Sequence, residues 1–260
     1  MIAAEVGMSE TAFVRSIQQD ARDAYIDILF FTPNTQVGLC GHATIAAGAA
    51  LQERGLLLLG DYLQNTTLGQ IPVKSHGTDI FSRKISYRQY VPNNPSQLSR
   101  EEVADALDIK PSQLLSHKIF QPVGLHTDAL VGLRSGEELN SLSPTPERVA
   151  GFTSRKGLEG MHVFALGGDG EHYAARSRNF APRVGIPEES ATGSATGLLA
   201  SELIRQRVIT ASQARSLVFS QGENLGQPSE IWVHTEGAAN EPAIYVGGRA
   251  VKDREISVTL

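Results

Sequence analysis

One local arrangement occurs twice in this chain, and this repetition limits the fold more than any other feature. In the first half a strand-like run ends at Phe31-Thr32-Pro33, and the stretch CGHAT (40–44) then precedes a helix of small residues. In the second half Phe180-Ala181-Pro182 leads through a loop of nearly equal length to SATGS (190–194) and a similar helix. Repetition of one supersecondary unit indicates an internal duplication. The sequence therefore predicts two similar lobes, each with strands wrapped around one central helix.

Local patterns place the first of these elements. The run AYIDILFF (24–31) alternates between two faces and predicts a strand whose inward side chains are Ile26, Ile28 and Phe30. The stretch ATIAAGAALQER (43–54) predicts a helix that ends at Gly55. Its first three turns are small and apolar all round, as in a helix that other structure encloses.

A helix signal also suggests where the lobes divide. SREEVADALDI (99–109) predicts a helix that opens with Ser99 and Glu102 in a capping-box pattern. A fresh series of strand-like runs follows it. We therefore expect an N-terminal lobe over 1–115 and a C-terminal lobe over 116–260, and an α+β fold for the chain as a whole.

Composition excludes several classes of protein. The chain has 260 residues, a formal net charge of -5 and no cluster of Lys and Arg, so we expect no nucleic-acid partner. No run approaches the roughly 18 apolar residues of a membrane-spanning helix, and the first residues do not read as a signal peptide. Cys40 is the only cysteine and cannot form an intrachain disulfide, which fits a cytoplasmic protein.

Motifs for cofactors and metals are missing from the sequence. It contains no GxxxxGK[ST] segment, no GxGxxG after a strand and no GxSxG elbow. Its seven histidines are scattered, without an HxxxH or HxH pair. The sequence therefore predicts no cofactor and no metal site.

The starts of the two small-residue helices are candidate binding sites. A helix N-terminus offers unpaired backbone N–H groups and partial positive charge, and so it binds anions. The residues there are small enough for a ligand to approach the backbone: Gly41, Ala43, Ala191, Gly193 and Ser194. Two such starts facing each other across a cleft would hold a carboxylate. The alternative is a pair of well-packed helix starts without a ligand, and the residues alone leave both open.

His42 lies at the first of these starts. We expect the helix dipole to favour its neutral form, which can exchange a proton near pH 7. A histidine that hydrogen-bonds a loop carbonyl is the alternative, and the sequence does not separate the two.

Carboxylates lie close to both starts. Glu10 precedes the strand-like run 12–17, and beside an apolar lobe its pKa would rise and suit a general acid/base. An exposed glutamate at a strand end is the simpler alternative. Glu188 and Glu189 precede the second helix, either as charge partners of its N-terminus or as a second functional carboxylate.

Cys40 allows one mechanism to be excluded. Two-base racemases of this duplicated shape use a thiol from each lobe. Ser190 stands at the position that corresponds to Cys40, and the chain has no second cysteine. A thiol-pair racemase is therefore excluded, and we interpret Cys40 as a small buried residue.

Five stretches together resemble the PhzF-like family of phenazine-biosynthesis isomerases. They follow one another over nearly the whole chain: MSETAFV, FFTPNTQVGLCGHATIAAG, RNFAPRVGIPEESATGSATG, QGENLGQPSEIWV and YVGGRAV. The resemblance implies the diaminopimelate-epimerase-like fold, with two pseudo-symmetric lobes, each a barrel-like sheet around a central helix. It also implies a homodimer that moves a proton without a cofactor.

The resemblance assigns roles to the candidate residues. The family's catalytic glutamate corresponds to Glu10, its cleft histidine to His42, and the turn that grips the substrate carboxylate to Gly193 and Ser194. Glu189 is expected as a further catalytic carboxylate. The expected substrate-binding set is completed by two neighbours, Ser9 and Gly41.

Three departures from the family pattern bear on the function. Glu189-Ser190 stands where the family usually has Asp-Pro, and Gln227 where many relatives have Arg. The family's usual first strand, Gly-Asn-Pro turn and helix are largely absent, so we expect the N-terminal lobe to lack its first strand and helix. The leading prediction is a cofactor-independent isomerase of a small carboxylate. The alternatives are a racemase or epimerase of another substrate, and a catalytically silent binding protein of the same fold.

Overall fold

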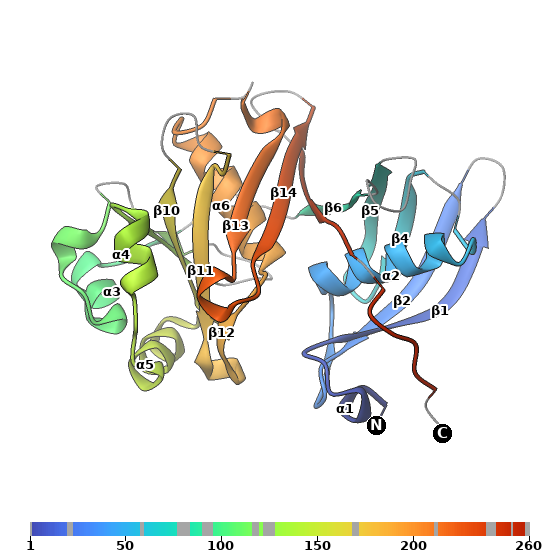
Figure 1. Cartoon of the computed structure of the whole chain (residues 1–260), viewed down its shortest axis with the longest axis horizontal. Helices are drawn as coiled ribbons and strands as arrows, with labels where there is room; N and C mark the ends of the chain where they lie inside the picture. Colours follow the sequence, from blue (N-terminus) through green and yellow to red (C-terminus); the bar gives the residue numbers. More distant parts are fainter. Residues whose placement is uncertain are drawn as a thin grey trace. The chain divides into compact units, whose positions relative to one another are not determined.

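The computed structural model describes residues 2–19, 23–57, 60–76, 84–89, 96–115, 120–121, 128–167, 172–210, 213–237, 243–250 and 252–257. The chain divides into two compact units (Figure 1). Unit 1 consists of Met1–Arg88 and Tyr245–Leu260, and unit 2 of Gln89–Ile244.

Unit 1 is a sheet with one long helix against it. Its elements are α1 (Ile2–Val6), β1 (Thr11–Gln19), β2 (Ala24–Phe31), β3 (Gln36–Val37), α2 (Gly41–Glu53), β4 (Tyr62–Thr66), β5 (Gly69–His76), β6 (Lys84–Gln89) and β15 (Ala243–Gly248). The strands lie in the order β1-β2-β4-β5-β6-β15, and β3 pairs with β2.

Unit 2 is a larger sheet with four helices among its described residues. Its elements are β7 (Ser96–Gln97), α3 (Arg100–Leu107), β8 (Phe120–Gln121), β9 (Ala129–Leu133), α4 (Gly136–Ser141), α5 (Pro146–Lys156), β10 (Met161–Leu166), β11 (Ala175–Ala181), β12 (Ile186–Glu189), α6 (Gly193–Arg205), β13 (Leu217–Gln221) and β14 (Ser229–Glu236). The strands lie in the order β14-β13-β11-β10-β9-β8-β7, and β12 pairs with β11. Helices α3, α4 and α5 gather beside the sheet, apart from α6 (Figure 1).

The duplication is visible in how the strands pair. In unit 1, β1–β2 is antiparallel, β2–β4 parallel and β4–β5 antiparallel. In unit 2, β10–β11 is antiparallel, β11–β13 parallel and β13–β14 antiparallel. The strand before each long helix also carries a short antiparallel partner, β3 on β2 and β12 on β11. The two units therefore repeat one topology, as the duplicated stretches predict.

The two long helices differ in how far they are enclosed. In α6 every residue from 195 to 200 is buried. Helix α2 buries one face through Ala43, Thr44, Gly48 and Leu51, whereas Ala46 and Ala50 are exposed. The expectation of an enclosed helix over 43–54 is therefore wrong, because α2 lies against its sheet and keeps an exposed face (Figure 1), whereas α6 is the more enclosed helix.

Several local predictions are confirmed. Strand β2 covers the predicted run 24–31, and its inward side chains are each 1% exposed: Ile26, Ile28 and Phe30. Helix α2 ends in a Schellman motif, in which Gly55 has a φ of 67° and Leu56 N–H donates to the carbonyl of Leu51. The Ser99 hydroxyl accepts a hydrogen bond from the backbone N–H of Glu102 and caps α3.

The division between the units differs from the one suggested near residue 115. The apolar face of α3 joins one core with β9, α5 and β10, through side chains that include Val103, Leu107, Val131, Phe152 and Val163. Because α3 buries this face in a core built from elements of unit 2, the described segment before residue 115 folds with unit 2. The pattern of α3 shows an apolar face but not which core receives it.

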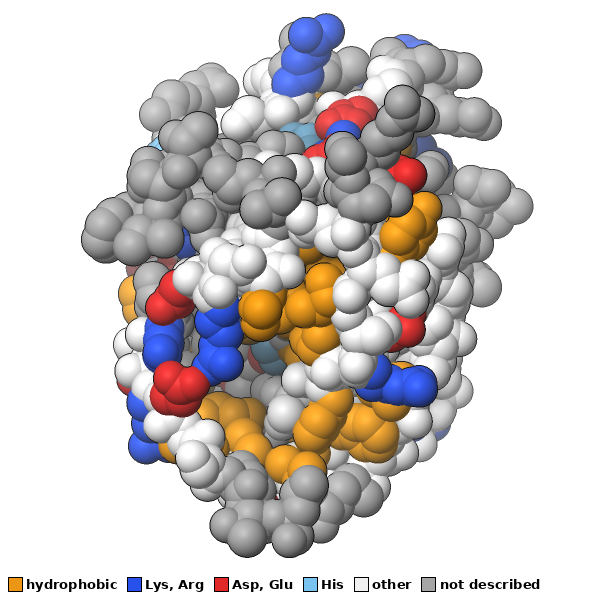
Figure 2. Space-filling model, turned by 90° about the vertical axis from the view of Figure 1, so that its right-hand side faces the viewer, with side chains coloured by type: hydrophobic (Ala, Val, Ile, Leu, Met, Phe, Trp, Pro, Cys, Tyr) orange, Lys and Arg blue, Asp and Glu red, His pale blue; other side chains and the backbone are white. Residues whose placement is uncertain are grey.

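The surface has the apolar content that is ordinary for folded proteins. Large hydrophobic side chains are exposed at separate points of the described chain: Met8, Val14, Leu56, Leu68, Val184, Leu225 and Ile256. Figure 2 shows one face, on which apolar side chains form groups among polar and charged ones. Within the described ranges, no helix is both long enough and apolar enough to span a membrane.

Among the buried titratable side chains of unit 2, His162 and Asp128 have the strongly shifted pKa values. His162 on β10 is 0% exposed, and its Nδ1 lies 3.1 Å from Oδ1 of Asn179 on the paired strand. Burial lowers the pKa of His162 to about 4. Asp128 lies directly before β9. Burial first, and then the charges of Glu159 and Glu189, raises the pKa of its carboxyl to about 7. Both groups are therefore neutral near pH 5.5.

We predict that Asp128→Asn stabilises the protein more at pH 8 than at pH 5. The folded carboxyl keeps its proton up to about pH 7, whereas the unfolded one loses it near its ordinary value of 3.8, so its contribution to stability falls as pH rises through this window. The difference between the two pH values is of the order of 3 kcal/mol. Melting curves of both proteins at the two pH values measure it.

The contribution of His162 to stability depends on pH in the opposite direction. The pKa of His162 is lowered in the folded state, so its contribution is lost as pH falls from 6.5 towards 4. Wild type should therefore show a flatter profile than the Asp128→Asn variant, which should lose stability more steeply in acid. A difference in melting temperature that is the same at both pH values would contradict the assignment to Asp128.

Candidate active site

Glu10 and His42 meet at one edge of the unit 1 sheet. Glu10 is the residue before β1, whose first residue Thr11 stands opposite Phe31 at the end of β2. His42 is the second residue of α2, which begins after the loop that follows β2. This arrangement places Oε2 of Glu10 3.1 Å from Nε2 of His42.

The contact joins a largely buried carboxylate to a more open imidazole. The side chain of Glu10 is 17% exposed and that of His42 43%. Oε2 of Glu10 is buried and, within the described chain, has no partner with hydrogen-bond geometry, so the contact is best described as an ion pair. The polar contact with His42 lowers the pKa of Glu10, burial opposes this, and Ser9 lowers it further.

The protonation states that we expected from the sequence are therefore wrong for both residues. The pKa of Glu10 is lowered, although an apolar surrounding alone would raise it. Contact with the sulfur of Cys40, followed by contact with Glu10, raises the pKa of His42 to about 10. Specific neighbours thus outweigh both burial and the dipole of α2, and near pH 7 the pair is a carboxylate beside an imidazolium.

Cys40 belongs to the same cluster. It is 7% exposed, as expected for a small buried residue, and its Sγ lies 3.7 Å from Nδ1 and 3.6 Å from Nε2 of His42. One ligand atom each of Glu10, Cys40 and His42 lies within 4.8 Å of the other two, a spacing that a metal ion can use. The residue pattern alone does not indicate this cluster, although only Gly41 separates Cys40 from His42 in the sequence.

A second set of predicted residues meets at the start of α6 in unit 2. Glu189 ends β12, and its Oε2 accepts a hydrogen bond of 2.6 Å from the hydroxyl of Thr192. Gly193 and Ser194 are the first residues of α6, where a backbone N–H has no acceptor within the helix. The predicted residues thus form two local sets, one in each unit: Ser9, Glu10, Gly41 and His42 in unit 1, and Glu189, Gly193 and Ser194 in unit 2.

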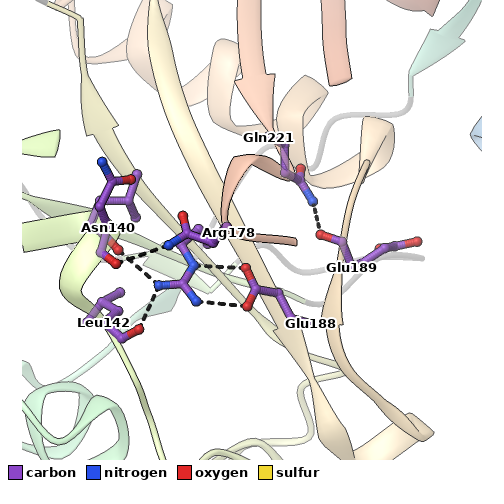
Figure 3. Close-up of polar contacts among 8 residues, drawn as sticks. Asn140, Leu142, Arg178, Glu188, Glu189 and Gln221 are labelled. Carbon is purple, nitrogen blue, oxygen red and sulfur yellow. Dashed lines mark hydrogen bonds and ion pairs between the residues drawn. The ribbon is translucent and has the colours of Figure 1, made fainter. Parts of the chain in front are cut away.

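Gln221 holds this second turn in place and was not predicted. It is 0% exposed at the end of β13. Its Nε2 donates to the carbonyl of Glu189 at 2.8 Å (Figure 3) and to the hydroxyl of Thr192 at 3.0 Å, and its Oε1 accepts from the N–H of Thr192 at 3.1 Å. One buried amide therefore fixes the chain on both sides of Ser190.

Gly222 allows the chain after Gln221 to come this close. Its φ is 90°, and a Cβ there would collide with the carbonyl oxygens of Ser190 and Gln227. Both Gln221 and Gly222 lie in QGENLGQPSEIWV, one of the stretches that carry the family resemblance. That stretch was the available signal, but only the folded chain shows that it supports the turn before α6.

Glu188 and Glu189 are neighbours with different partners. Both oxygens of Glu188 accept hydrogen bonds of 2.8 Å from the guanidinium of Arg178 (Figure 3). Arg178 also donates to the carbonyls of Leu139 and Leu142. The side chains of Arg178 and Glu188 are 8% and 13% exposed, so this is a buried ion pair. Glu188 is therefore a structural residue, and alternation along β12 turns Glu189 the other way.

We predict that the two glutamates respond differently to loss of charge. Glu188→Gln leaves the guanidinium of Arg178 buried without its counter-ion and should destabilise the protein by about 3–5 kcal/mol. Glu189→Gln keeps a side-chain oxygen for Thr192 and should cost much less. Urea unfolding of both variants measures the difference, and similar losses of stability would show that Glu188 is not the structural partner.

Comparisons with known proteins agree with this architecture. A model of the family of phenazine biosynthesis-like proteins, PhzC-PhzF, matches residues 1–255. An uncharacterized isomerase of Clostridium acetobutylicum is 29% identical over 96% of this chain and 84% of its own length. Trans-2,3-dihydro-3-hydroxyanthranilate isomerase of Pseudomonas aeruginosa is 32% identical over 95% of this chain and 83% of its own.

A solved structure is similar over the whole chain. The crystal structure of a Bacillus anthracis phenazine biosynthesis protein of the PhzF family matches 100% of this chain and 87% of its own, with a TM-score of 0.82 and 24% identity. The predicted two-lobed α+β fold is thereby confirmed. With a family match over nearly all its length and isomerases among its relatives, the chain belongs to the family of phenazine biosynthesis-like proteins and is an isomerase.

Proposed function

We propose that this isomerase moves a proton on a small cyclic carboxylate without a cofactor, and that Glu10 carries the proton. The observation that supports this most is the 3.1 Å contact between Glu10 and His42. It holds a largely buried carboxylate ionised, since the neighbouring imidazole lowers the pKa of Glu10. Glu10 thus enters the reaction in its basic form and can take a proton from a substrate carbon.

The step returns the enzyme to its starting state. Glu10 removes a proton from one carbon, becomes a neutral carboxyl group whose proton can exchange with water, and delivers a proton to another carbon. No atom is gained or lost, which is the balance that an isomerisation needs. In this proposal the imidazolium of His42 keeps Glu10 ionised until the substrate offers its proton.

The second set of residues is proposed to bind the substrate. The backbone N–H groups of Gly193 and Ser194 start a helix, where the partial positive charge suits a carboxylate. Glu189, fixed through Thr192, is proposed as a further carboxylate at the substrate. The name of the Pseudomonas aeruginosa relative points to a cyclic amino acid as the substrate class.

Three further parts of the proposal rest on the family resemblance and on composition. Ser9 and Gly41 are proposed to contact the substrate beside Glu10 and His42. The protein is proposed to be a homodimer in the cytoplasm. Sedimentation at several protein concentrations tests the dimer, and a monomer throughout would contradict it.

We predict that Glu10→Gln slows turnover by about 10²–10⁴-fold, because the variant keeps the shape of the side chain but cannot carry a proton. Trans-2,3-dihydro-3-hydroxyanthranilate and related cyclic amino acids are incubated in heavy water, and mass spectrometry follows deuterium uptake. Glu5→Gln, on the exposed face of α1, is the matched control and should behave as wild type. Wild-type deuterium uptake by Glu10→Gln would make His42 the candidate carrier.

We predict that His42→Asn moves the acidic limb of the pH profile upwards. In wild type the limb reports protonation of Glu10 and lies below the ordinary glutamate value of 4.5, because the contact with His42 lowers this pKa. The variant removes the cation and leaves burial, which raises the pKa of Glu10. The deuterium assay over a pH series measures the acidic limb of wild type and of the variant, and circular dichroism confirms that both remain folded in acid. If the acidic limb lies at the same pH in both proteins, His42 does not set the ionisation of Glu10.

A further inference from the structure

Three different metal-ligating side chains converge at the start of α2. Sγ of Cys40 lies 3.6 Å from Nε2 of His42, and Oε2 of Glu10 lies 3.1 Å from the same nitrogen. In a tetrahedral zinc site, bonds of about 2.3 Å to sulfur and about 2.0 Å to nitrogen and oxygen place S and N about 3.6 Å apart and N and O about 3.3 Å apart. Two of the three ligand separations therefore already fit one ion.

The fold holds these ligands on regular elements. Cys40 and His42 flank Gly41, the first residue of α2, and Glu10 directly precedes β1, which pairs with the strand before that helix. The carboxylate oxygen of Glu10 that faces His42 is buried and lacks a hydrogen bond. The imidazole of His42 is 43% exposed, which provides an entry path, and a water molecule can complete four ligands.

The chemistry of the ligands selects the kind of ion. Thiolate and imidazole suit borderline-soft transition metals such as Zn²⁺, whereas Mg²⁺ and Ca²⁺ require oxygen ligands. We propose that Glu10, Cys40 and His42 form a site for a zinc-like transition-metal ion, and that this ion inhibits the isomerase reversibly. The ion is an inhibitor here and takes no part in the reaction.

Inhibition follows from the identity of the ligands. An ion bound to Glu10 occupies the oxygen that would receive the substrate proton, and it replaces the ion pair between Glu10 and His42. This half of the inference rests on the proposed role of Glu10. Binding itself does not, since it depends only on the three side chains and their separations.

Cobalt(II) titration of the whole protein tests the site, because a thiolate bound to cobalt gives a charge-transfer absorption. Cys40 is the only cysteine, so any such absorption reports this residue. We expect one equivalent of Co²⁺ to produce the band and Zn²⁺ to remove it. Cys40→Ser should lack the band, and Glu10→Gln and His42→Asn should each weaken binding at least tenfold. His172→Asn, which changes an exposed histidine in unit 2, is the control and should match wild type.

One measurement on the wild-type protein keeps the test independent of how the variants fold and of the isomerase assay. In wild type, Zn²⁺ should protect Cys40 from alkylation by iodoacetamide, whereas Mg²⁺ should not. Absence of the cobalt band, absence of protection, or unchanged affinity in folded Glu10→Gln and His42→Asn would overturn the site. A different result is possible, in which Zn²⁺ binding depends on Glu10, Cys40 and His42 but deuterium uptake continues at the same rate. The proposal that the ion inhibits the enzyme then fails, and so does the proposed role of Glu10 as proton carrier.

Discussion

The candidate site follows from one constraint of the fold. Each unit repeats a set of four strands, β1, β2, β4 and β5 in unit 1 and β10, β11, β13 and β14 in unit 2, and one pair of neighbours in each set is parallel. The pairs are β2–β4 and β11–β13, and their neighbours in the set are antiparallel. Parallel neighbours cannot be joined by a hairpin, so the chain must cross over, and here a helix makes each crossing. In each unit the connection folds back as a short antiparallel strand on the end of the first strand, β3 on β2 and β12 on β11, and the helix begins shortly after it. Backbone N–H groups are therefore presented at Gly41 and at Gly193 for the same topological reason.

The ionisable pair of Glu10 and His42 in unit 1 has no counterpart at the equivalent positions of unit 2. Thr11 stands opposite Phe31, and Met161 stands opposite Phe180, the residue that corresponds to Phe31 in the repeat. The position of Glu10 in unit 1 is therefore that of Gly160 in unit 2, and the second residue of the long helix is His42 in unit 1 and Ser194 in unit 2. At Gly160 a Cβ would lie 2.7 Å from both the Asp128 carboxyl and the Phe180 carbonyl, so no side chain fits. This asymmetry is consistent with the proposed roles, proton transfer by residues of unit 1 and carboxylate binding by residues of unit 2.

The sequence predicts those features that depend on near neighbours along the chain. The alternation of 24–31, the cap at Ser99 and the left-handed Gly55 are local, and each is found where expected. The buried pair of Arg178 and Glu188 and the clamp of Gln221 depend on contacts between distant segments, and residue patterns do not specify them. The same limit applies to the candidate site, where Glu10 and His42 could be chosen from the sequence but their protonation could not. Their protonation follows from the contact between Glu10, before β1, and His42, at the start of α2, together with the contact of His42 with the sulfur of Cys40. Burial or the helix dipole alone would predict a pKa shift in the opposite direction for each of these two residues.

A comparison of Asp128 with Glu10 shows how the contact with His42 changes the pKa of a shielded carboxyl group. Asp128 is buried, its charged neighbours are acids, and its pKa rises to about 7. Glu10 is also largely shielded from water, yet its pKa falls, because His42 stands 3.1 Å away. Burial alone would favour the protonated form of Glu10, which cannot accept a proton in the proposed reaction. The histidine at the start of α2 is therefore the element that makes a shielded carboxylate usable as a base.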